Sequence, residues 1–190
     1  GGGLELDGGL ARNCIITGNT AADGGGAFLN YGAVVRSCRI FDNYAMNGGG
    51  VNVGDTGVVL NCTIADNAAT NSGGGLYSTS DVTVINSIIY FNSAPDGTNY
   101  SITGSLSASY SCTTPLLAGT GNLDADPRLT PSLLLQDTSP CIDSGTSTNA
   151  PPTDILGRSR WDHLDHVNVV SIYDMGADEF IDDDRDAMAD

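Results

Sequence analysis

Two aspartates 24 residues apart are the first pair whose spacing could do chemistry. Asp42 and Asp66 each stand directly before an asparagine. If the chain repeats every 24 residues, the two carboxylates would lie on neighbouring turns about 5 Å apart, near the carboxyl separation of a retaining glycosidase. An Asp-Asn pair is also ordinary turn chemistry, because both side chains hydrogen-bond to nearby backbone groups. Both interpretations stay open from these residues alone.

Three arginines form the only basic group in the first half of the chain. Arg12 and Arg36 are 24 residues apart and would stack on adjacent turns, facing outward. Arg39 would lie on the next strand of the same turn as Arg36. Guanidinium groups recognise carboxylates and other anions, so these arginines are candidates for binding a glycan, with Tyr31 as an aromatic contact.

The end of the chain carries aspartates at the spacing of a calcium loop. Asp182, Asp184, Asp186 and Asp190 would occupy loop positions 1, 3, 5 and 9, and their oxygens suit a hard cation such as calcium. Ala187 replaces the glycine of the sharp turn, and the sequence stops before position 12. The loop is therefore incomplete, and an acidic linker is the alternative interpretation.

A second group of possible metal ligands lies between residues 161 and 166. His163 and His166, together with Asp162 and Asp165, could bind a metal ion. A solvated loop is the simpler interpretation, because the chain has no other histidine.

The charge balance excludes several classes of partner. The chain has 23 acidic and 7 basic residues, so its net charge of −16 would repel nucleic acid and anionic membrane surfaces. No apolar stretch approaches the ~18 residues of a membrane-spanning helix, and direct membrane insertion is not expected. All seven basic residues are arginine, which excludes a catalytic lysine.

A repeat of about 24 residues organises the first part of the chain. Gly-Gly-Gly triplets begin at Gly1, Gly24, Gly48 and Gly73, in steps of 23, 24 and 25 residues. Three further columns keep the same phase. The columns are a marker pair (Asn13-Cys14, Ser37-Cys38, Asn61-Cys62, Asn86-Ser87 and, as the expected fifth copy, Ser111-Cys112), an isoleucine (Ile16, Ile40, Ile64, Ile89, then Thr114) and an asparagine (Asn19, Asn43, Asn67, Asn92).

The repeat unit has the pattern of short strands. Residues favoured in strands lie between corners of Gly, Asn, Asp and Ser, and no stretch has helical periodicity. A 24-residue β unit cannot bury its apolar side alone, but units stacked in register at about 4.8 Å can. The pattern predicts an all-β, right-handed parallel β-helix of six or seven turns, with the isoleucines inside and both asparagine columns stacked at corners. Residues 1–120 would be regular turns, residues 121–180 the last irregular turns and a cap over the open end, and residues 181–190 the Asp-rich tail.

Most of the cysteines are expected to be small buried side chains. Cys14, Cys38, Cys62 and Cys112 are assigned to one inward position of the repeat. Their neighbouring Cβ atoms would lie about 4.8 Å apart, whereas a disulfide needs about 3.8 Å. The pair Cys112 and Cys141 stays open, because the second half of the chain is less regular.

Several motifs in the second half resemble a known group of proteins. They are Asp126-Pro127, Ser139-Pro140-Cys141-Ile142-Asp143-Ser144-Gly145, Asp154 with Gly157 and Arg158, and Asp174-Met175-Gly176-Ala177. With the glycine triplets, they resemble the C-terminal part of large secreted bacterial right-handed β-helix proteins with a choice-of-anchor domain. Those proteins are distantly similar to polymorphic outer-membrane-protein repeats and to the pectate-lyase superfamily. The resemblance implies a secreted or cell-surface setting, with Asp143, Asp154 and Asp174 as turn and cap carboxylates bonded to backbone N–H groups.

The expected function is that of a non-enzymatic β-helical stalk or adhesin-like module, which binds extracellular polysaccharide or a surface protein. The resemblance also implies an alternative, a polysaccharide lyase or glycoside hydrolase of pectate-lyase-like fold, with Asp42, Asp66 and Arg36 as catalytic candidates. A purely structural sheath or filament segment is the third hypothesis. Calcium is the one cofactor expected. The chain begins at Gly1 without a methionine, so either a signal was removed or the chain is part of a longer protein. We expect the second, because the Asp-rich motif breaks off at residue 190.

Overall fold

The protein is built from short strands. The computed structural model describes residues 1–160 and 170–181, and these contain strands of two to five residues and no helix. Within these ranges there is accordingly no helix with the length and apolarity needed to cross a membrane.

The strands form three parallel five-stranded sheets and one two-stranded sheet. Sheet 1 contains β1 (Leu4–Asp7), β4 (Ala27–Asn30), β8 (Val51–Val53), β12 (Leu76–Ser78) and β15 (Tyr100–Ile102). Sheet 2 contains β2 (Leu10–Arg12), β5 (Ala33–Arg36), β9 (Thr56–Leu60), β13 (Asp81–Ile85) and β16 (Leu106–Ser109). Sheet 3 contains β3 (Ile15–Thr17), β6 (Arg39–Phe41), β10 (Thr63–Ala65), β14 (Ile88–Tyr90) and β17 (Cys112–Thr113). Sheet 4 contains β7 (Tyr44–Asn47) and β11 (Ala68–Ser72).

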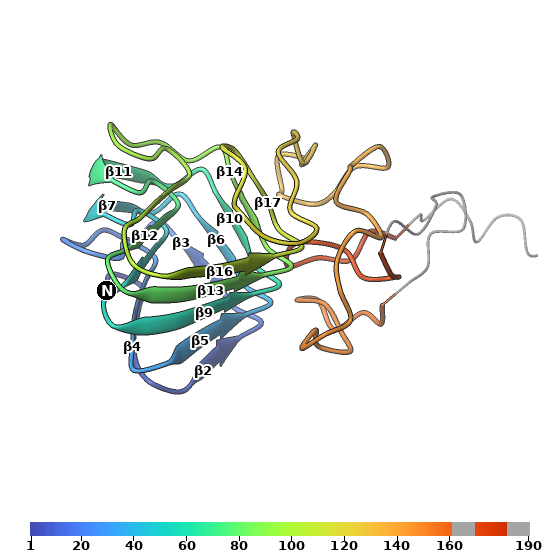
Figure 1. Ribbon diagram of the computed structural model, residues 1–190, viewed down its shortest axis with the longest axis horizontal. Helices are drawn as coiled ribbons and strands as arrows, with labels where there is room; N and C mark the ends of the chain where they lie inside the picture. The colour runs from blue at the N-terminus through green and yellow to red at the C-terminus, as the bar shows by residue number, and fades with distance from the viewer. Residues whose placement is uncertain (161–169, 182–190) are drawn as a thin grey trace, which may run out of the picture.

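Each strand pairs with the strand one turn later, so the chain forms the predicted all-β parallel β-helix. In sheet 3, Ile16 pairs with Ile40, Ile40 with Ile64 and Ile64 with Ile89, at separations of 24, 24 and 25 residues. All four isoleucines face the interior and belong to one continuous apolar core. Figure 1 shows the stack, with the sheet 2 strands lying one above another from β2 to β16.

The glycine triplets are needed because successive turns approach closely where they lie. The amide of Gly25 donates to the carbonyl of Gly48, and the amide of Gly49 donates to that of Gly73. A Cβ atom at Gly49 would come within 2.4 Å of the Ala68 carbonyl oxygen, so no larger residue fits there without moving the backbone.

The fifth copy of the marker lies one residue earlier than the sequence suggested. Cys112 pairs with Ile88 and Thr113 with Ile89, so Thr113 rather than Thr114 continues the isoleucine column. The marker pair in this turn is therefore Tyr110-Ser111, because the step between the last two turns is 24 residues and not 25.

This shift removes Cys112 from the inward cysteine column. Cys14, Cys38 and Cys62 hold that column in the first three turns, and serines continue it, with the Ser87 amide donating to the hydroxyl of Ser111. In this structure no disulfide joins the five cysteines, and all except Cys14 in the first turn are buried, as the sequence predicted for most of them.

The corner between sheets 3 and 4 carries the predicted asparagine ladder. The Nδ2 group of Asn43 donates to Oδ1 of Asn67 at 3.0 Å, and Asn67 donates in the same way to Asn92. Asn19 begins the ladder, and Asn99, seven residues after Asn92, ends it. Each interior asparagine also donates to a carbonyl of the preceding turn, so the ladder joins the turns through buried polar groups.

The corner between sheets 2 and 3 differs from the expected amide stack. Its five corner residues have left-handed backbones with φ between 48° and 54°, and they are Asn13, Ser37, Asn61, Asn86 and Tyr110. Two of these side chains, Asn13 and Asn86, bond to the C-terminal half of the chain instead of to one another. The Asn86 amide exchanges two hydrogen bonds of 2.7 and 2.8 Å with the backbone of Thr146, and Asn13 donates to the carbonyl of Asp154.

The stack has about five turns, fewer than the six or seven expected. Residues 114–123 close its last turn, with Leu117 packed into the core and the Asn122 side chain accepting the amide of Ser111 at 3.0 Å. The described residues that follow, 124–160 and 170–181, do not add turns, and we call them the C-terminal segment. Figure 1 shows this segment beside the stack, at the ends of the sheet 2 strands.

The C-terminal segment covers the outward face of sheet 3. The Gly176 amide donates to the Asn86 carbonyl at 2.7 Å, and the Ala177 amide donates to Oγ1 of Thr63 at 3.0 Å. Ile88 on the same outward face is fully buried, whereas Ile15 in the first turn is 58% exposed. The segment therefore packs along the side of several turns, where the sequence had suggested a cap over one end.

Replacing an interior rung of the asparagine ladder should destabilise the protein strongly. In Asn67→Ala, the buried Ile40 carbonyl and Asn43 amide lose their side-chain partners, so we expect the free energy of unfolding to fall by about 3 kcal/mol. The matched control is Asn71→Ala, because exposed Asn71 makes a single side-chain bond to Asn47 and should change stability by less than about 0.5 kcal/mol. Urea unfolding of both variants measures the difference, and equal losses would contradict a structural role for the ladder.

Candidate functional site

The outer face of sheet 2 carries two arginines without partners. Arg12 at the end of β2 pairs in register with Arg36 at the end of β5, so their side chains lie on neighbouring turns as predicted. Within residues 1–160 and 170–181, neither guanidinium has an ion pair or a hydrogen bond. The other arginines in these ranges do have partners, which are Asp178 for Arg39, the Thr138 carbonyl for Arg128, Asp154 for Arg158 and Glu179 for Arg160.

A shallow groove of about 380 Å³ lies on the same face, across β9, β13 and β16. It lies toward the starts of these strands and includes Gly32, next to Tyr31. Val58 in its floor pairs with Val34, which stands two residues before Arg36 on β5. Its lining offers hydroxyls and one carboxylate around a small apolar floor. The lining includes Thr56, Val58, Asp81, Thr83, Ser105 and Ser107.

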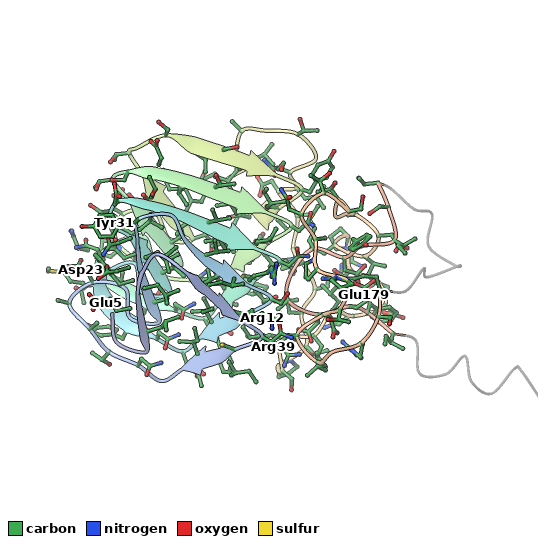
Figure 2. All side chains as sticks on the ribbon, turned by 90° about the horizontal axis from the view of Figure 1, so that it is seen from below. Glu5, Arg12, Asp23, Tyr31, Arg39 and Glu179 are labelled. Carbon is green, nitrogen blue, oxygen red and sulfur yellow. The ribbon has the colours of Figure 1, made fainter. Side chains whose placement is uncertain are left out.

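Tyr31 lies at the opposite end of the face from the arginines. It occupies the corner before β5 with φ 51°, and its side chain is 71% exposed. Five residues of nearly extended chain separate it from Arg36, which is roughly 16 Å along the strand. Figure 2 shows Tyr31 and Arg12 well apart, so the structure does not gather the predicted glycan-binding residues into one cluster.

Arg39 is held by the C-terminal segment. Its Nε donates to the Asp178 carboxylate at 2.7 Å, and its terminal nitrogen forms an ion pair with the other carboxylate oxygen. The two side chains are only 11% and 3% exposed, so this guanidinium is not presented to solvent beside Arg12 and Arg36. No sequence pattern indicated this pair, because the partners are 139 residues apart and no repeat relates them.

Asp42 and Asp66 lie together at the corner between sheets 3 and 4. Both are exposed, with φ near 54°, and the Asp42 amide donates to the Asp66 carbonyl at 3.2 Å. Partial burial and the neighbouring Asp42 charge raise the pKa of the Asp66 carboxyl. Gly18 and Phe91 hold the same corner position in other turns, also with positive φ. The position thus selects a left-handed backbone, and a carboxylate is not required there.

The two predicted pairs are also separated from each other. Arg12 and Arg36 precede the strands of sheet 3, and Asp42 and Asp66 follow them. The outward positions between these corners are covered by the C-terminal segment, in which the Ala177 amide reaches Thr63. A single ligand therefore does not meet both pairs across this face, which argues against joining Arg36 and the two aspartates in one active site.

All of the expected metal ligands lie outside the described residues. Asp182, Asp184, Asp186 and Asp190 do, and so do the histidine group Asp162, His163, Asp165 and His166. Among residues 1–160 and 170–181, no three His, Cys, Asp or Glu side chains are arranged to hold a metal ion.

Two of the three carboxylates that the resemblance assigned to turns and the cap, those of Asp154 and Asp174, are buried and accept backbone amides. Asp154 accepts the backbone amides of Leu156 and Arg158 at 2.9 Å each. Asp174 accepts those of Asp143 and Phe180 at 2.8 and 2.6 Å. Burial is the main cause that raises the pKa of Asp174 well above its ordinary value, and the charge of Glu179 adds to it.

Comparison of the chain with protein-family models, with curated proteins and with solved structures gives no match. The functional argument therefore depends on the geometry of the chain itself.

The two kinds of arginine should respond oppositely to truncation. Arg39→Ala leaves the carboxylate of Asp178 buried without its main counter-ion, and we expect a loss of about 3–5 kcal/mol of unfolding free energy. Arg12→Ala removes an exposed, unpaired side chain and should change stability by less than about 0.5 kcal/mol. Chemical denaturation checks both, and a similar cost for the two would show that Arg12 has a structural partner.

Stability should rise as the pH is lowered from 7 towards 4. The pKa values of Asp174 and Asp178 are raised in the folded protein, chiefly by burial, so the folded state binds more protons than the unfolded state in this range. Their contribution is complete below the unfolded pKa of about 4 and is lost as the pH rises through the folded values. Measuring the free energy of unfolding across this pH range gives its slope against pH, and this slope should be smaller in Asp174→Asn. A slope of the opposite sign would contradict the assignment.

Proposed function

We propose that the protein is a non-enzymatic β-helical module of a secreted or cell-surface bacterial protein, and that it binds acidic extracellular polysaccharides. The binding face is the outer face of sheet 2. The observation that carries this proposal is the register pairing of Arg12 and Arg36, two guanidinium groups on neighbouring turns without a partner among the described residues.

The charge of the chain makes this pair unusual. With 23 acidic against 7 basic residues, carboxylates are abundant, and three of the remaining described arginines are each bound by one. Two unpaired guanidiniums on adjacent strands repel each other, and an anionic ligand that meets both relieves this repulsion. A polysaccharide with a carboxylate on successive sugars provides such charges, and Arg recognises carboxylates with directed hydrogen bonds.

The groove on the same face supports the polysaccharide over a small anion. Its hydroxyl groups from Thr56, Thr83, Ser105 and Ser107 can exchange hydrogen bonds with sugar hydroxyls, and the floor at Val58 offers apolar contact. Successive turns repeat the face at about 4.8 Å, so an extended chain can run along the stack and meet several turns at once. The regular stack also suits the stalk-like role, because each added turn extends the same surface.

Two forms of one polysaccharide that differ in charge test the proposal. We expect polygalacturonate to retard the protein in affinity electrophoresis and to bind in calorimetry, whereas its fully methyl-esterified form, which lacks the carboxylate charge, binds at least tenfold more weakly. The double variant Arg12→Ala/Arg36→Ala should lose at least about tenfold in affinity, since each charge-assisted contact contributes about 1 kcal/mol or more. Arg128→Ala is the matched control, because Arg128 is an arginine outside sheet 2, bonded to Thr138.

Four results would overturn the proposal. Equal binding of the acidic and esterified polymers, or unchanged binding by the double variant, would remove the arginine pair from recognition. New chain ends released from any polysaccharide, with or without calcium, would instead show a lyase or hydrolase, and Asp42→Asn and Asp66→Asn would then test the corner carboxylates. No binding to a broad acidic panel would leave a structural segment or a protein-binding stalk.

A further inference from the structure

Two cysteines from distant parts of the chain meet under the C-terminal segment. Cys112 begins β17 and faces outward, because its register partner is Ile88 on the outward face of sheet 3. Cys141 lies in the C-terminal segment that covers this face. Both are fully buried in one apolar cluster with Ile88 and Met175.

The backbone holds each of these cysteines in place independently of the other. The Cys112 amide donates to the Ser87 carbonyl at 2.8 Å, and its thiol points to the Ala125 carbonyl at 3.1 Å. The Cys141 carbonyl accepts the Met175 amide at 3.0 Å, and the Cys141 amide donates to the Ser139 hydroxyl at 3.2 Å. The fold itself therefore brings the two cysteines into one cluster.

The inward column of cysteines has a different constraint. Cys14, Cys38 and Cys62 occupy equivalent positions in successive turns, with thiols directed at carbonyls of their own turn. In-register parallel strands keep neighbouring Cβ atoms about 4.8 Å apart, beyond the ~3.8 Å that a disulfide prefers. Cys112 and Cys141 are free of this constraint, because Cys141 belongs to no strand of the sheet.

We propose that Cys112 and Cys141 form a disulfide bond that fastens the C-terminal segment to the last turn of the β-helix. The oxidant is a small-molecule or protein disulfide, and the reaction is thiol–disulfide exchange. Each cysteine gives up its thiol hydrogen, an S–S bond forms between the two Sγ atoms, and the S–S bond of the oxidant is broken to give two thiols. Since both thiols are buried in the folded chain, exchange takes place while the segment is away from the sheet, during folding.

The bond has a mechanical consequence for the protein. It closes a loop between residues 112 and 141, and it fixes the C-terminal segment near the fourth and fifth turns. The Arg39–Asp178 pair fixes the same segment near the second turn. Cross-linking restricts the unfolded chain, so the oxidised form should unfold about 5–15 °C above the reduced form.

Peptide mapping tests the connection directly. The chain has no lysine, so trypsin cuts only after arginine and places Cys112 in fragment 40–128 and Cys141 in fragment 129–158. After refolding with oxidised glutathione, alkylation of free thiols and digestion, we expect these two fragments to be linked and to separate on reduction. If all five cysteines are alkylated, the proposal is overturned.

Variants identify which cysteine of fragment 40–128 is used, since it also contains Cys62. Cys62→Ser is the matched control, because serine already holds the equivalent position at Ser87 and Ser111, and it should keep the link. Cys112→Ser and Cys141→Ser should each abolish it. A link that persists in Cys112→Ser and disappears in Cys62→Ser would overturn the assignment.

A second test compares the melting temperature of each protein with and without reductant, and it can also be used for variants that are destabilised. The melting temperature of the oxidised protein should fall on reduction in the natural chain and in Cys62→Ser, and should not change in Cys141→Ser. This comparison is made within each protein, so any loss of packing from the substitution cancels. An equal melting temperature with and without reductant in the natural chain would contradict a fastening role.

Discussion

The described strands are held by backbone hydrogen bonds between each turn and the next, and this pairing constrains everything else in the molecule. Parallel in-register pairing places each residue about 4.8 Å from its counterpart one turn later. A residue type that suits one turn must then suit a whole column. Isoleucine fills the core column, and the asparagines of the corner ladder hydrogen-bond to one another. Glycine lets the turns approach where any Cβ atom would collide.

Because of the same pairing, a charged residue that recurs in successive turns stands next to a residue of like charge. The resulting repulsion is relieved differently on the outer faces of sheets 2 and 3. On sheet 3 the outward residues are covered, and Arg39 is neutralised by Asp178. On sheet 2, Arg12 is exposed and Arg36 is half-buried, and the two remain side by side without a partner among the described residues. The contrast between a covered and an open face is the basis for assigning recognition to sheet 2.

The C-terminal segment has no repeat and is held by polar chemistry. Asp154 and Asp174 bind backbone amides from residues close to them in space, and Arg158 and Arg160 complete the network with Asp154 and Glu179. These buried groups satisfy one another, which allows an irregular chain to pack tightly without strands. The segment also leaves the N-terminal turn less covered, as the exposure of Ile15 shows.

The sequence alone determined the β-helix, its period and its inner columns, because identical residues at a constant spacing are only compatible with stacked turns. Ile16 to Ile89 and Asn19 to Asn92 could be placed in this way, and so could the stacking of Arg12 on Arg36. Only the tertiary structure decided the register of the fifth turn, where a one-residue difference in loop length turned Cys112 from the inward column to the outer face. It also decided that Arg39 pairs with Asp178, that Tyr31 lies far from Arg36, and that the second half packs on the side of the stack. These contacts join residues that no period relates, and their energies depend on burial and on distances in space, which the spacing along the chain does not contain.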